Sequence, residues 1–453
     1  MKNVSFYLSS QGSSEMLSRQ VDLQIQKGVD MENFVINVVP EQRYQKIVGF
    51  GGAFTEASAY CYSKLSKENK EKVIKAYFDQ KGMQYNLGRT HIQSSDFTEK
   101  EYAYVEDGDE ELSTFTIAKD KEYILPFVKD ALQETGENLR LFASPWSPPG
   151  WMKDNGMRTN GGRLLKKYYS HWAEMMVRYF KEYQKEEVMF FGLTVQNEAK
   201  APQTWESCEY SAEEEGEFLA NYLRPALDKA GFEDLKVMVW DHNKERAYDR
   251  PRDIFKVPGA KEATWGIGVH FYSGDHFGAL EMAHRAFPDK PILVTEFAYG
   301  KEERLSLPIP HSGWEEVELT AFDLICGFNN YLAGVVDWNL LLDQNGGPFH
   351  DRDSGCKAGI IVDTKAGIFQ LEPLYYVMRH FSQFICKDAI RIGCSSYTKN
   401  LVSTAFENPN GEIVLLVLNQ SSAIQKADIR LGNECIKVEL PEKSLATIVI
   451  SKE

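Results

Sequence analysis

Two glutamates, Glu198 and Glu296, stand at the ends of apolar runs that read as buried strands. Glu198 closes the run FFGLTVQNE (190–198), and Glu296 closes PILVTE (291–296). Hydrolysis of a glycosidic bond uses two carboxyl groups that flank the bond. A separation of about 5–5.5 Å gives retention through a glycosyl-enzyme, and about 6.5–9.5 Å leaves room for water and gives inversion. The pair indicates glycoside hydrolysis, and the spacing along the chain leaves the stereochemical outcome open.

Two polar residues could assist these carboxylates. Asn197 directly precedes Glu198, and an amide there can hold a sugar 2-hydroxyl as the oxocarbenium-like transition state develops. Arg89 lies near the end of the run QYNLGRTHI (84–92), where it could keep a nucleophilic carboxylate ionised. A structural ion pair is the alternative reading of this arginine.

His270 and Tyr272 alternate in the run GVHFY (268–272). Alternate residues of a strand project to one face. Both side chains could therefore converge on Glu296, and we expect them to contact the substrate as well.

Acidic and aromatic residues follow other strand-like runs. Asp96 comes just beyond the run that holds Arg89, and Trp338 sits in Asp337-Trp338-Asn339. Trp146 lies in the segment SPWSPPGW (144–151), whose prolines fix the backbone and hold the ring rigidly.

The elements that must position these residues form an alternating pattern. Amphipathic stretches such as 67–78, 165–184 and 212–230 separate short apolar runs. There are eight such runs: 46–53, 84–92, 139–144, 188–196, 236–242, 266–272, 291–297 and 334–339. Eight β–α units predict an α/β fold of the (β/α)8 TIM-barrel type, whose active sites lie at the C-terminal ends of the strands. A doubly wound open sheet is the alternative, and the missing GxGxxG after the first run disfavours it.

Both ends of the chain instead carry short alternating strands without helices. The first region is too small to form a core alone. We therefore predict a β-sandwich side domain built from both termini. The predicted divisions are 1–44 for its N-terminal part, 45–382 for the catalytic barrel and 383–453 for its C-terminal part.

Composition and charge exclude several other classes of protein. The formal net charge of −15 and the lack of a basic patch argue against nucleic acid as a partner. No apolar stretch approaches the ~20 residues of a membrane span. The N-terminal residues show no signal-peptide pattern, and the seven cysteines lack CxxC spacing, so we expect reduced thiols and a cytoplasmic location. No His/Cys/Asp cluster has the spacing of metal ligands, which predicts no metal.

Several segments together make the chain similar to glycoside hydrolase family 30, the family of lysosomal glucocerebrosidase. The matching segments are GFGGAFTEASA (49–59), YNLGRTHIQSSDF (85–97), LFASPWSPPGWMK (141–153), LTVQNE (193–198), GVHFY (268–272), VTEF (294–297) and DWNLLLDQNGGP (337–348). The resemblance implies a retaining enzyme without metal or organic cofactor. It implies Glu198 as acid/base and Glu296 as nucleophile.

The same resemblance assigns the remaining residues. Four of them fall on positions that line the sugar-binding pocket of the family: Asp96, Trp146, Asn197 and Trp338. The other three fall on positions that support the nucleophile: Arg89, His270 and Tyr272. The loops 200–211 and 343–359 look distinct from the family pattern, and FHDRD (349–353) could add polar contacts on the aglycone side.

The leading hypothesis is an exo-acting β-glucosidase or glucosylceramidase-like enzyme, with Asp96 gripping a terminal glucose. The substrate would be a small glycoside or oligosaccharide. β-1,6-Glucanase, β-xylosidase and β-fucosidase activities remain alternatives within the same chemistry. A non-catalytic carbohydrate-binding protein is an alternative of another class, although it would not need both glutamates. A metal-dependent hydrolase would lose activity in a chelator, and we expect no such loss.

Overall fold

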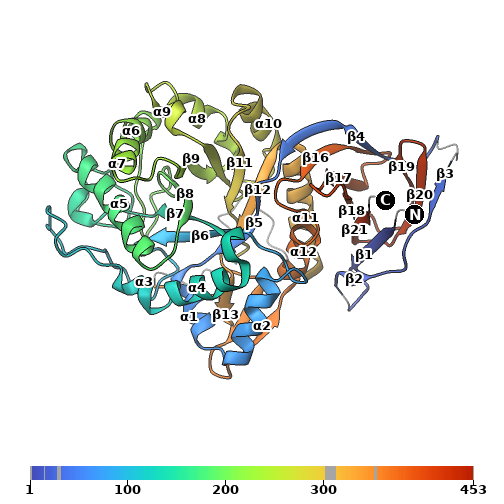
Figure 1. Cartoon of the computed structure of the whole chain (residues 1–453), viewed down its shortest axis with the longest axis horizontal. Helices are drawn as coiled ribbons and strands as arrows, with labels where there is room; N and C mark the ends of the chain where they lie inside the picture. The colour runs from blue at the N-terminus through green and yellow to red at the C-terminus, as the bar shows by residue number, and fades with distance from the viewer. Residues whose placement is uncertain (1–2, 15, 28–31, 301–312, 351–354, 452–453) are drawn as a thin grey trace.

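A closed parallel barrel and a large antiparallel sheet make up the molecule in the computed structural model (Figure 1). The structure describes residues 3–14, 16–27, 32–300, 313–350 and 355–451. Among these residues, no helix is both long and apolar enough to cross a membrane.

The barrel has eight parallel strands that close in the order β10-β11-β12-β5-β6-β7-β8-β9. The strands are β5 (Gly49–Ala53), β6 (Leu87–Ile92), β7 (Arg140–Pro145), β8 (Phe190–Thr194), β9 (Lys236–Asn243), β10 (Gly266–His270), β11 (Ile292–Glu296) and β12 (Leu332–Asp337). Each falls within or overlaps one of the eight predicted runs. The TIM-barrel prediction is confirmed, and the open-sheet alternative is wrong because β12 pairs with β5 and closes the ring.

The glycines of β5 are needed for this closure. A side chain at Gly51 would place its Cβ 1.9 Å from the carbonyl oxygen of Leu87 on β6. Only glycine allows the two backbones to approach so closely.

Helices surround the barrel and cover it with apolar faces. They are α1 (Glu56–Ser63), α2 (Lys67–Phe78), α3 (Ala118–Glu122), α4 (Ile124–Thr135), α5 (Tyr169–Lys185), α6 (Ala212–Phe218), α7 (Arg224–Lys229), α8 (Asp249–Ile254), α9 (Ala260–Ala263), α10 (Phe277–Ala286), α11 (Gly313–Asn329) and α12 (Pro373–Ser382). A π-helical turn over Leu219–Leu223 joins α6 to α7. Helix α6 begins with a capping box, in which Ser211 and Glu214 satisfy each other's backbone N–H groups.

The side domain contains a ten-stranded sheet in the order β2-β1-β21-β18-β17-β16-β4-β19-β20-β3. Its strands are β1 (Val4–Ser10), β2 (Ser18–Arg19), β3 (Ile25–Lys27), β4 (Val35–Lys46), β16 (Ile390–Ser396), β17 (Leu401–Glu407), β18 (Ile413–Asn419), β19 (Gln425–Leu431), β20 (Glu434–Leu440) and β21 (Ser444–Ile450). Strands β1 and β21 pair in register from Val4↔Ile450 to Ser10↔Ser444, so the two ends of the chain lie side by side. The prediction of a sandwich built from both termini is confirmed.

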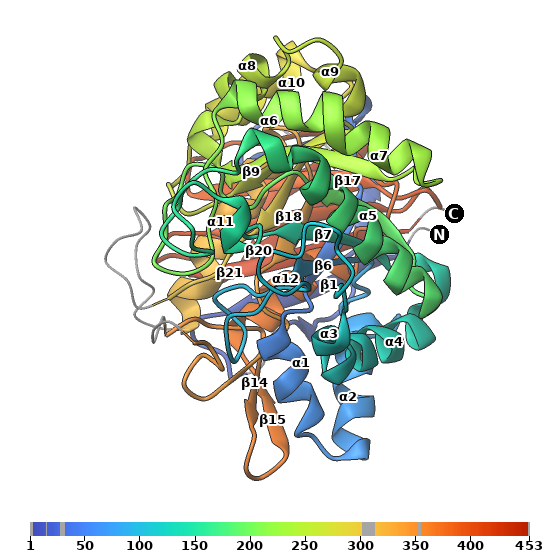
Figure 2. The same ribbon diagram turned by 90° about the vertical axis from the view of Figure 1, so that its left-hand side faces the viewer.

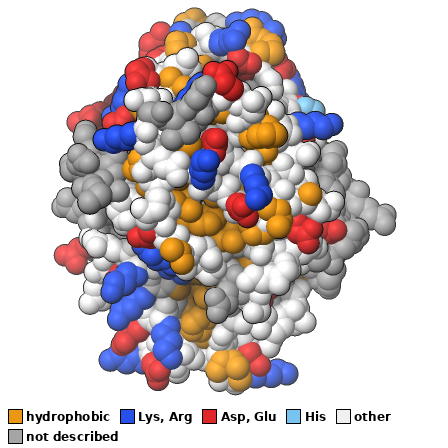
Figure 3. Space-filling model, turned by 90° about the vertical axis from the view of Figure 1, so that its right-hand side faces the viewer, with side chains coloured by type: hydrophobic (Ala, Val, Ile, Leu, Met, Phe, Trp, Pro, Cys, Tyr) orange, Lys and Arg blue, Asp and Glu red, His pale blue; other side chains and the backbone are white. Residues whose placement is uncertain are grey.

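Strand β4 links the two parts of the molecule. It arches from the sandwich toward the barrel at the top of Figure 1. On the opposite side of the barrel, a three-stranded sheet of β13 (Leu341–Asp343), β14 (Ile360–Asp363) and β15 (Ile368–Leu371) projects downward in Figure 2. The end of the molecule in Figure 3 carries acidic and basic side chains interspersed around a central group of hydrophobic ones.

Candidate active site

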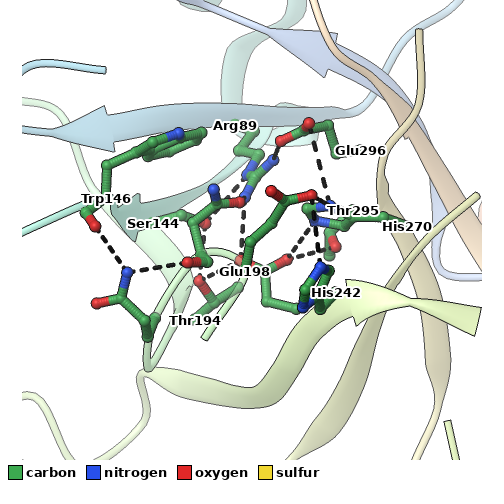
Figure 4. Close-up of polar contacts among 12 residues, drawn as sticks. Arg89, Ser144, Trp146, Thr194, Glu198, His242, His270, Thr295 and Glu296 are labelled. Atoms are coloured by element: carbon green, nitrogen blue, oxygen red, sulfur yellow. Dashed lines mark hydrogen bonds and ion pairs between the residues drawn. The ribbon is translucent and has the colours of Figure 1, made fainter. Parts of the chain in front are cut away.

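The predicted site residues gather at the C-terminal ends of the barrel strands (Figure 4). Glu296 is the last residue of β11. Glu198 is not part of a strand, because β8 ends at Thr194 and Glu198 lies in the turn that follows. The prediction of a carboxylate at the end of the fourth barrel strand therefore holds only approximately.

The two glutamates lie close to each other. Glu198, His270 and Glu296 each offer one ligand atom, and these atoms all lie within 4.8 Å of one another. Inverting enzymes keep their two carboxyl groups about 6.5–9.5 Å apart, so that a water molecule fits between them. The nearest atoms of Glu198 and Glu296 are closer than that.

Glu296 is held by two hydrogen bonds. Arg89 Nη1 donates to Oε2 at 2.6 Å, and the Tyr272 hydroxyl donates to Oε1 at 2.9 Å. Both contacts favour the ionised carboxylate, since each donates a hydrogen to it. The expected convergence of Arg89 and Tyr272 on Glu296 is present in the structure.

Glu198 has a different set of neighbours. His270 Nδ1 lies 3.1 Å from Glu198 Oε1, and His242 Nε2 lies 3.9 Å from the same oxygen. His270 Nδ1 is 4.0 Å from Glu296, too far for a hydrogen bond. His270 therefore converges on Glu296, as expected, but its hydrogen bond is to Glu198.

Arg89 connects these groups to the barrel wall. Besides Glu296, its guanidinium donates to Ser144 at 3.0 Å, Asn197 at 2.8 Å and Asp241 at 3.0 Å. Arg89 is fully buried, so these partners replace the water that its charge has lost. The bond to Asn197 fixes the residue next to Glu198.

Asp241 is the second anion in contact with Arg89, and the sequence analysis gave it no role. Its carboxylate accepts from Thr194 at 2.6 Å and Thr295 at 2.5 Å, and His270 Nε2 lies 3.2 Å away. Burial would raise the pKa of Asp241, but Arg89 and His270 outweigh it and lower the pKa below its ordinary value.

A bulge in β9 turns Asp241 toward the site. Pairing with β10 passes from Trp240 directly to His242, so Asp241 is the extra residue. Both Trp240 and Asp241 have positive φ values, 75° and 47°, which are costly for residues other than glycine. The carboxylate of Glu215 holds the bulge by accepting from the Trp240 backbone N–H at 2.8 Å.

The backbone of Glu198 is attached to this bulge. Its N–H donates to the carbonyl oxygen of Asp241 at 3.0 Å, and its φ is 47°. The bulge and Glu198 therefore position each other. In the sequence, the only indication of a functional residue here is the polar strand end Trp240-Asp241-His242.

Trp146 and Trp338 form a stacked pair beside Arg89. Their ring centroids are 5.0 Å apart at an interplanar angle of 20°. The Arg89 guanidinium carbon lies 4.8 Å from the Trp146 ring and 5.4 Å from the Trp338 ring. The rings are only 2 % and 4 % exposed, so they shield Arg89 from water and offer little free face to a sugar.

Asp96 lies in the loop after β6. The loops after β8 and β12 form the same end of the site. Burial, together with Glu296 and Glu206, raises the pKa of Asp96 well above its ordinary value. Its Oδ1 atom is buried and has no hydrogen-bond partner among the described residues. Such an oxygen is available to bind a hydroxyl group of a ligand.

His350 ties these loops together. Its Nε2 lies 3.2 Å from Glu206 Oε2, and its Nδ1 lies 3.0 Å from the Thr98 carbonyl oxygen. Ser94 donates to the other oxygen of Glu206. Of the loop 349–353, His350 is thus in contact with two neighbouring loops, while Asp351, Arg352 and Asp353 lie outside the described residues.

The titration of the two glutamates is coupled through His270. Burial would lower the pKa of His270, but Glu296, Asp241 and Glu198 outweigh it and raise the pKa to about 9. Burial and the charge of Glu198 raise the pKa of Glu296, against the effect of His270 and Arg89. Burial would raise the pKa of Glu198, but the charge of His242 and then the hydrogen bond from His270 outweigh it and lower the pKa. Near neutral pH the proton between Glu198 and His270 therefore resides on the imidazole.

The same trio of Glu198, His270 and Glu296 has the arrangement of possible metal ligands. A cation would have to displace contacts that these groups already make, since Arg89 donates to Glu296. The Nδ1 atom of His270 is also engaged with Glu198.

Comparison with known proteins identifies the family. Residues 47–385 match the model described as "Glycosyl hydrolase family 30 TIM-barrel domain", and residues 388–448 match "Glycosyl hydrolase family 30 beta sandwich domain". The chain belongs to glycosyl hydrolase family 30.

Proteins similar to this chain carry the names of several activities. "Putative glucosylceramidase 3" of Caenorhabditis elegans is 33 % identical over 93 % of this chain and 83 % of its own length. "Lysosomal acid glucosylceramidase" of Mus musculus is 30 % identical over 86 % and 78 %. "Endo-1,6-beta-D-glucanase" of Neurospora crassa is 28 % identical over 85 % and 81 %. The crystal structure of SrfJ from Salmonella typhimurium has a TM-score of 0.95 and 31 % identity over the whole of both chains.

We predict that Asp241→Asn lowers the free energy of unfolding by about 3–5 kcal/mol, because it leaves the buried Arg89 with one fewer anionic partner. Urea unfolding measures the change. Asp249→Asn is the matched control. Asp249 pairs with Arg246 at 2.6 Å, and the two side chains are 34 % and 38 % exposed, respectively. That pair should be worth about 1 kcal/mol or less. Equal, small effects of the two substitutions would contradict the role given to Asp241.

We also predict a pH dependence of stability from His270. A pKa raised to about 9 in the folded protein, against about 6.5 in the unfolded chain, stabilises the fold below pH ~6.5. This contribution, on the order of 3 kcal/mol, is lost as the pH rises through 9. The stability difference between wild type and His270→Gln should therefore shrink between pH 6.5 and 9. A difference that stays constant or grows over this range would refute the raised pKa, as would an imidazole that titrates below pH 7 in NMR spectra of the wild type.

Proposed function

We propose that this family 30 glycosidase is a retaining, exo-acting β-glucosidase. One observation carries the proposal: two carboxylates within a retaining distance lie in different surroundings. Glu296 receives two hydrogen bonds that favour its anion, whereas Glu198 is paired with an imidazole that can hold a proton.

In the first step an oxygen of Glu296 attacks the anomeric carbon and forms a glycosyl ester. The glycosidic bond breaks as the leaving oxygen takes a proton from Glu198. We infer that His270 supplies this proton across the 3.1 Å contact, so the acid is the Glu198–His270 pair rather than Glu198 alone.

In the second step the Glu198–His270 pair accepts a proton from water. The hydroxide equivalent adds to the anomeric carbon, and the bond to Glu296 breaks. Arg89 and Tyr272 then stabilise the released Glu296 carboxylate. The carbonyl side of Asn197, which accepts from Arg89, orients the amide so that its N–H group can meet the sugar 2-hydroxyl.

The loops around Asp96 support action on a terminal sugar. His350 connects the loops after β6, β8 and β12 at one end of the site through Thr98 and Glu206. A polymer could pass this end only if those contacts opened. The unpartnered Oδ1 of Asp96 is suited to the outer hydroxyls of a terminal glucose.

The relatives favour glucose as the sugar and leave two kinds of aglycone. Glucosylceramidases are among the most similar curated proteins, at 30–33 % identity, which supports a β-glucoside joined to a lipid or to a smaller group. Endo-β-1,6-glucanase is the second candidate, because one of the relatives carries that activity in its name. A non-catalytic carbohydrate-binding role gives no reason for the distinct partners of Glu198 and Glu296.

A panel of 4-nitrophenyl glycosides together with a β-1,6-linked glucan tests the substrate. We expect kcat/KM to be highest for the β-glucoside, above the β-xyloside and β-fucoside, and only terminal glucose to leave the glucan. Asp96→Asn should lower kcat/KM on the β-glucoside by roughly 10- to 100-fold, because the amide replaces one acceptor oxygen with a donor that faces the sugar hydroxyls. Asp107→Asn, an exposed position in the same loop, is the control and should change little.

Release of internal oligosaccharides from the glucan, without turnover of the β-glucoside, would reject the exo-glucosidase in favour of the endo-glucanase. Turnover of the β-xyloside or β-fucoside alone would reject glucose as the sugar.

A further inference from the structure

A second pocket lies at the opposite end of the barrel from the catalytic residues, where the sandwich meets the barrel. It has a volume of about 610 Å³, which is within the range of about 300–1,000 Å³ typical of small-molecule sites. Its wall includes the end of β4, the first residues of β7 and β8, and the segments before β10 and β11. A ligand bound there would touch both the linking strand and the barrel.

Flat rings form much of this wall: Tyr44, Phe191, Trp265, His284 and Tyr331. The His284 ring stacks on Tyr331 with centroids 3.8 Å apart and an interplanar angle of 12°. Burial and then the charge of Arg391 lower the pKa of His284, which keeps its ring neutral and suited to stacking. Phe191 and Trp265 meet edge to face at 5.1 Å.

The charge of the pocket is opposite to that of the whole protein. Four basic residues line it against two acidic ones, although the chain carries a net charge of −15. The basic residues are Arg43, Lys46, Arg140 and Lys290, and the acidic ones are Asp289 and Asp388.

One guanidinium group of this wall, that of Arg140, makes no ion pair with a carboxylate among the described residues. Arg140 donates to the Val48 carbonyl oxygen, and its buried Nε has no hydrogen-bond partner among the described residues. Arg391 is not part of the wall: it is buried, donates to Gln45 at 3.0 Å and lies 3.6 Å from the centre of the Tyr44 ring. The other three basic residues of the wall each have an acidic partner: Arg43 pairs with Glu407 at 2.6 Å, Lys46 with Asp388 at 3.6 Å and Lys290 with Asp289 at 3.1 Å. A partly desolvated cation without a counter-ion, such as Arg140, attracts an anion.

We propose that this pocket binds a small organic anion with a flat ring, namely an aryl or nucleoside monophosphate. The ring lies against the aromatic wall, and the phosphate faces the excess positive charge around Arg140. A ligand with only a ring or only a phosphate contacts one part of the wall. A ligand that carries both groups contacts both parts and therefore binds more tightly than either fragment. This site is independent of the catalytic function proposed above.

Isothermal titration calorimetry at low ionic strength tests the proposal with adenosine 5′-monophosphate and 1-naphthyl phosphate. Adenosine and inorganic phosphate serve as the ring without the charge and the charge without the ring. We expect saturable one-to-one binding of at least one monophosphate, and about tenfold or weaker affinity for each fragment. A saturating glucose-configured iminosugar, which would occupy the catalytic site, should leave this binding unchanged.

Arg140→Gln and Lys46→Glu should each weaken the monophosphate by about tenfold or more. Lys46 is 64 % exposed, so its variant keeps the test valid if Arg140→Gln does not fold. Lys365→Glu makes the same charge change at the exposed turn between β14 and β15 and should have no effect. The proposal is overturned if neither monophosphate binds saturably at millimolar concentration, if phosphate alone binds as tightly, if the iminosugar displaces the ligand, or if Lys365→Glu weakens binding as much as Lys46→Glu.

Discussion

The guanidinium of Arg89 is fully buried at the mouth of the barrel, between the carboxylates of Glu296 and Asp241. A buried charge is tolerated only where other groups replace the lost water. Its partners come from β7, β9, β11 and the turn after β8, so one cation sets the positions of four parts of the barrel relative to β6. The stacked tryptophans after β7 and β12 cover its remaining faces. The geometry of the site thus follows from the requirement to satisfy one charge.

The same arrangement makes two chemically identical side chains different. Glu296 shares the positive charge of Arg89, which favours its anion, and Glu198 does not touch Arg89. Glu198 instead contacts His270, whose other nitrogen meets Asp241. Asp241 therefore acts on both glutamates: it divides the charge of Arg89 with Glu296 and helps to keep His270 protonated beside Glu198. The parallel pairing of β9, β10 and β11 brings these groups together and gives the two glutamates their different partners.

Much of this arrangement could be predicted from the sequence, because apolar runs of strand length mark the barrel and polar residues follow them. Counting those runs placed Glu296 at a strand end and brought Arg89 and Tyr272 to it. The role of Asp241 could not be predicted, since it depends on a bulge that moves one residue out of register, and Trp240-Asp241-His242 reads as an ordinary strand end. The hydrogen bond of His270 to Glu198 could not be predicted, because a strand inside a barrel has neighbours on both sides and alternation along β10 does not say which carboxylate a ring nitrogen reaches. The contact between Glu206 and His350 joins loops 144 positions apart, and no local pattern indicates it.

Trapping the glycosyl-enzyme tests the central claim that Glu296 is the group that bonds to the sugar. A 2-deoxy-2-fluoro-β-glucoside with a good leaving group slows the second step more than the first, so the ester should accumulate. Mass spectrometry of the digested protein should then find one sugar on the peptide that contains Glu296, and none on the peptide that contains Glu198. A label on Glu198, or full turnover of the reagent by Glu296→Gln without any label, would contradict the account.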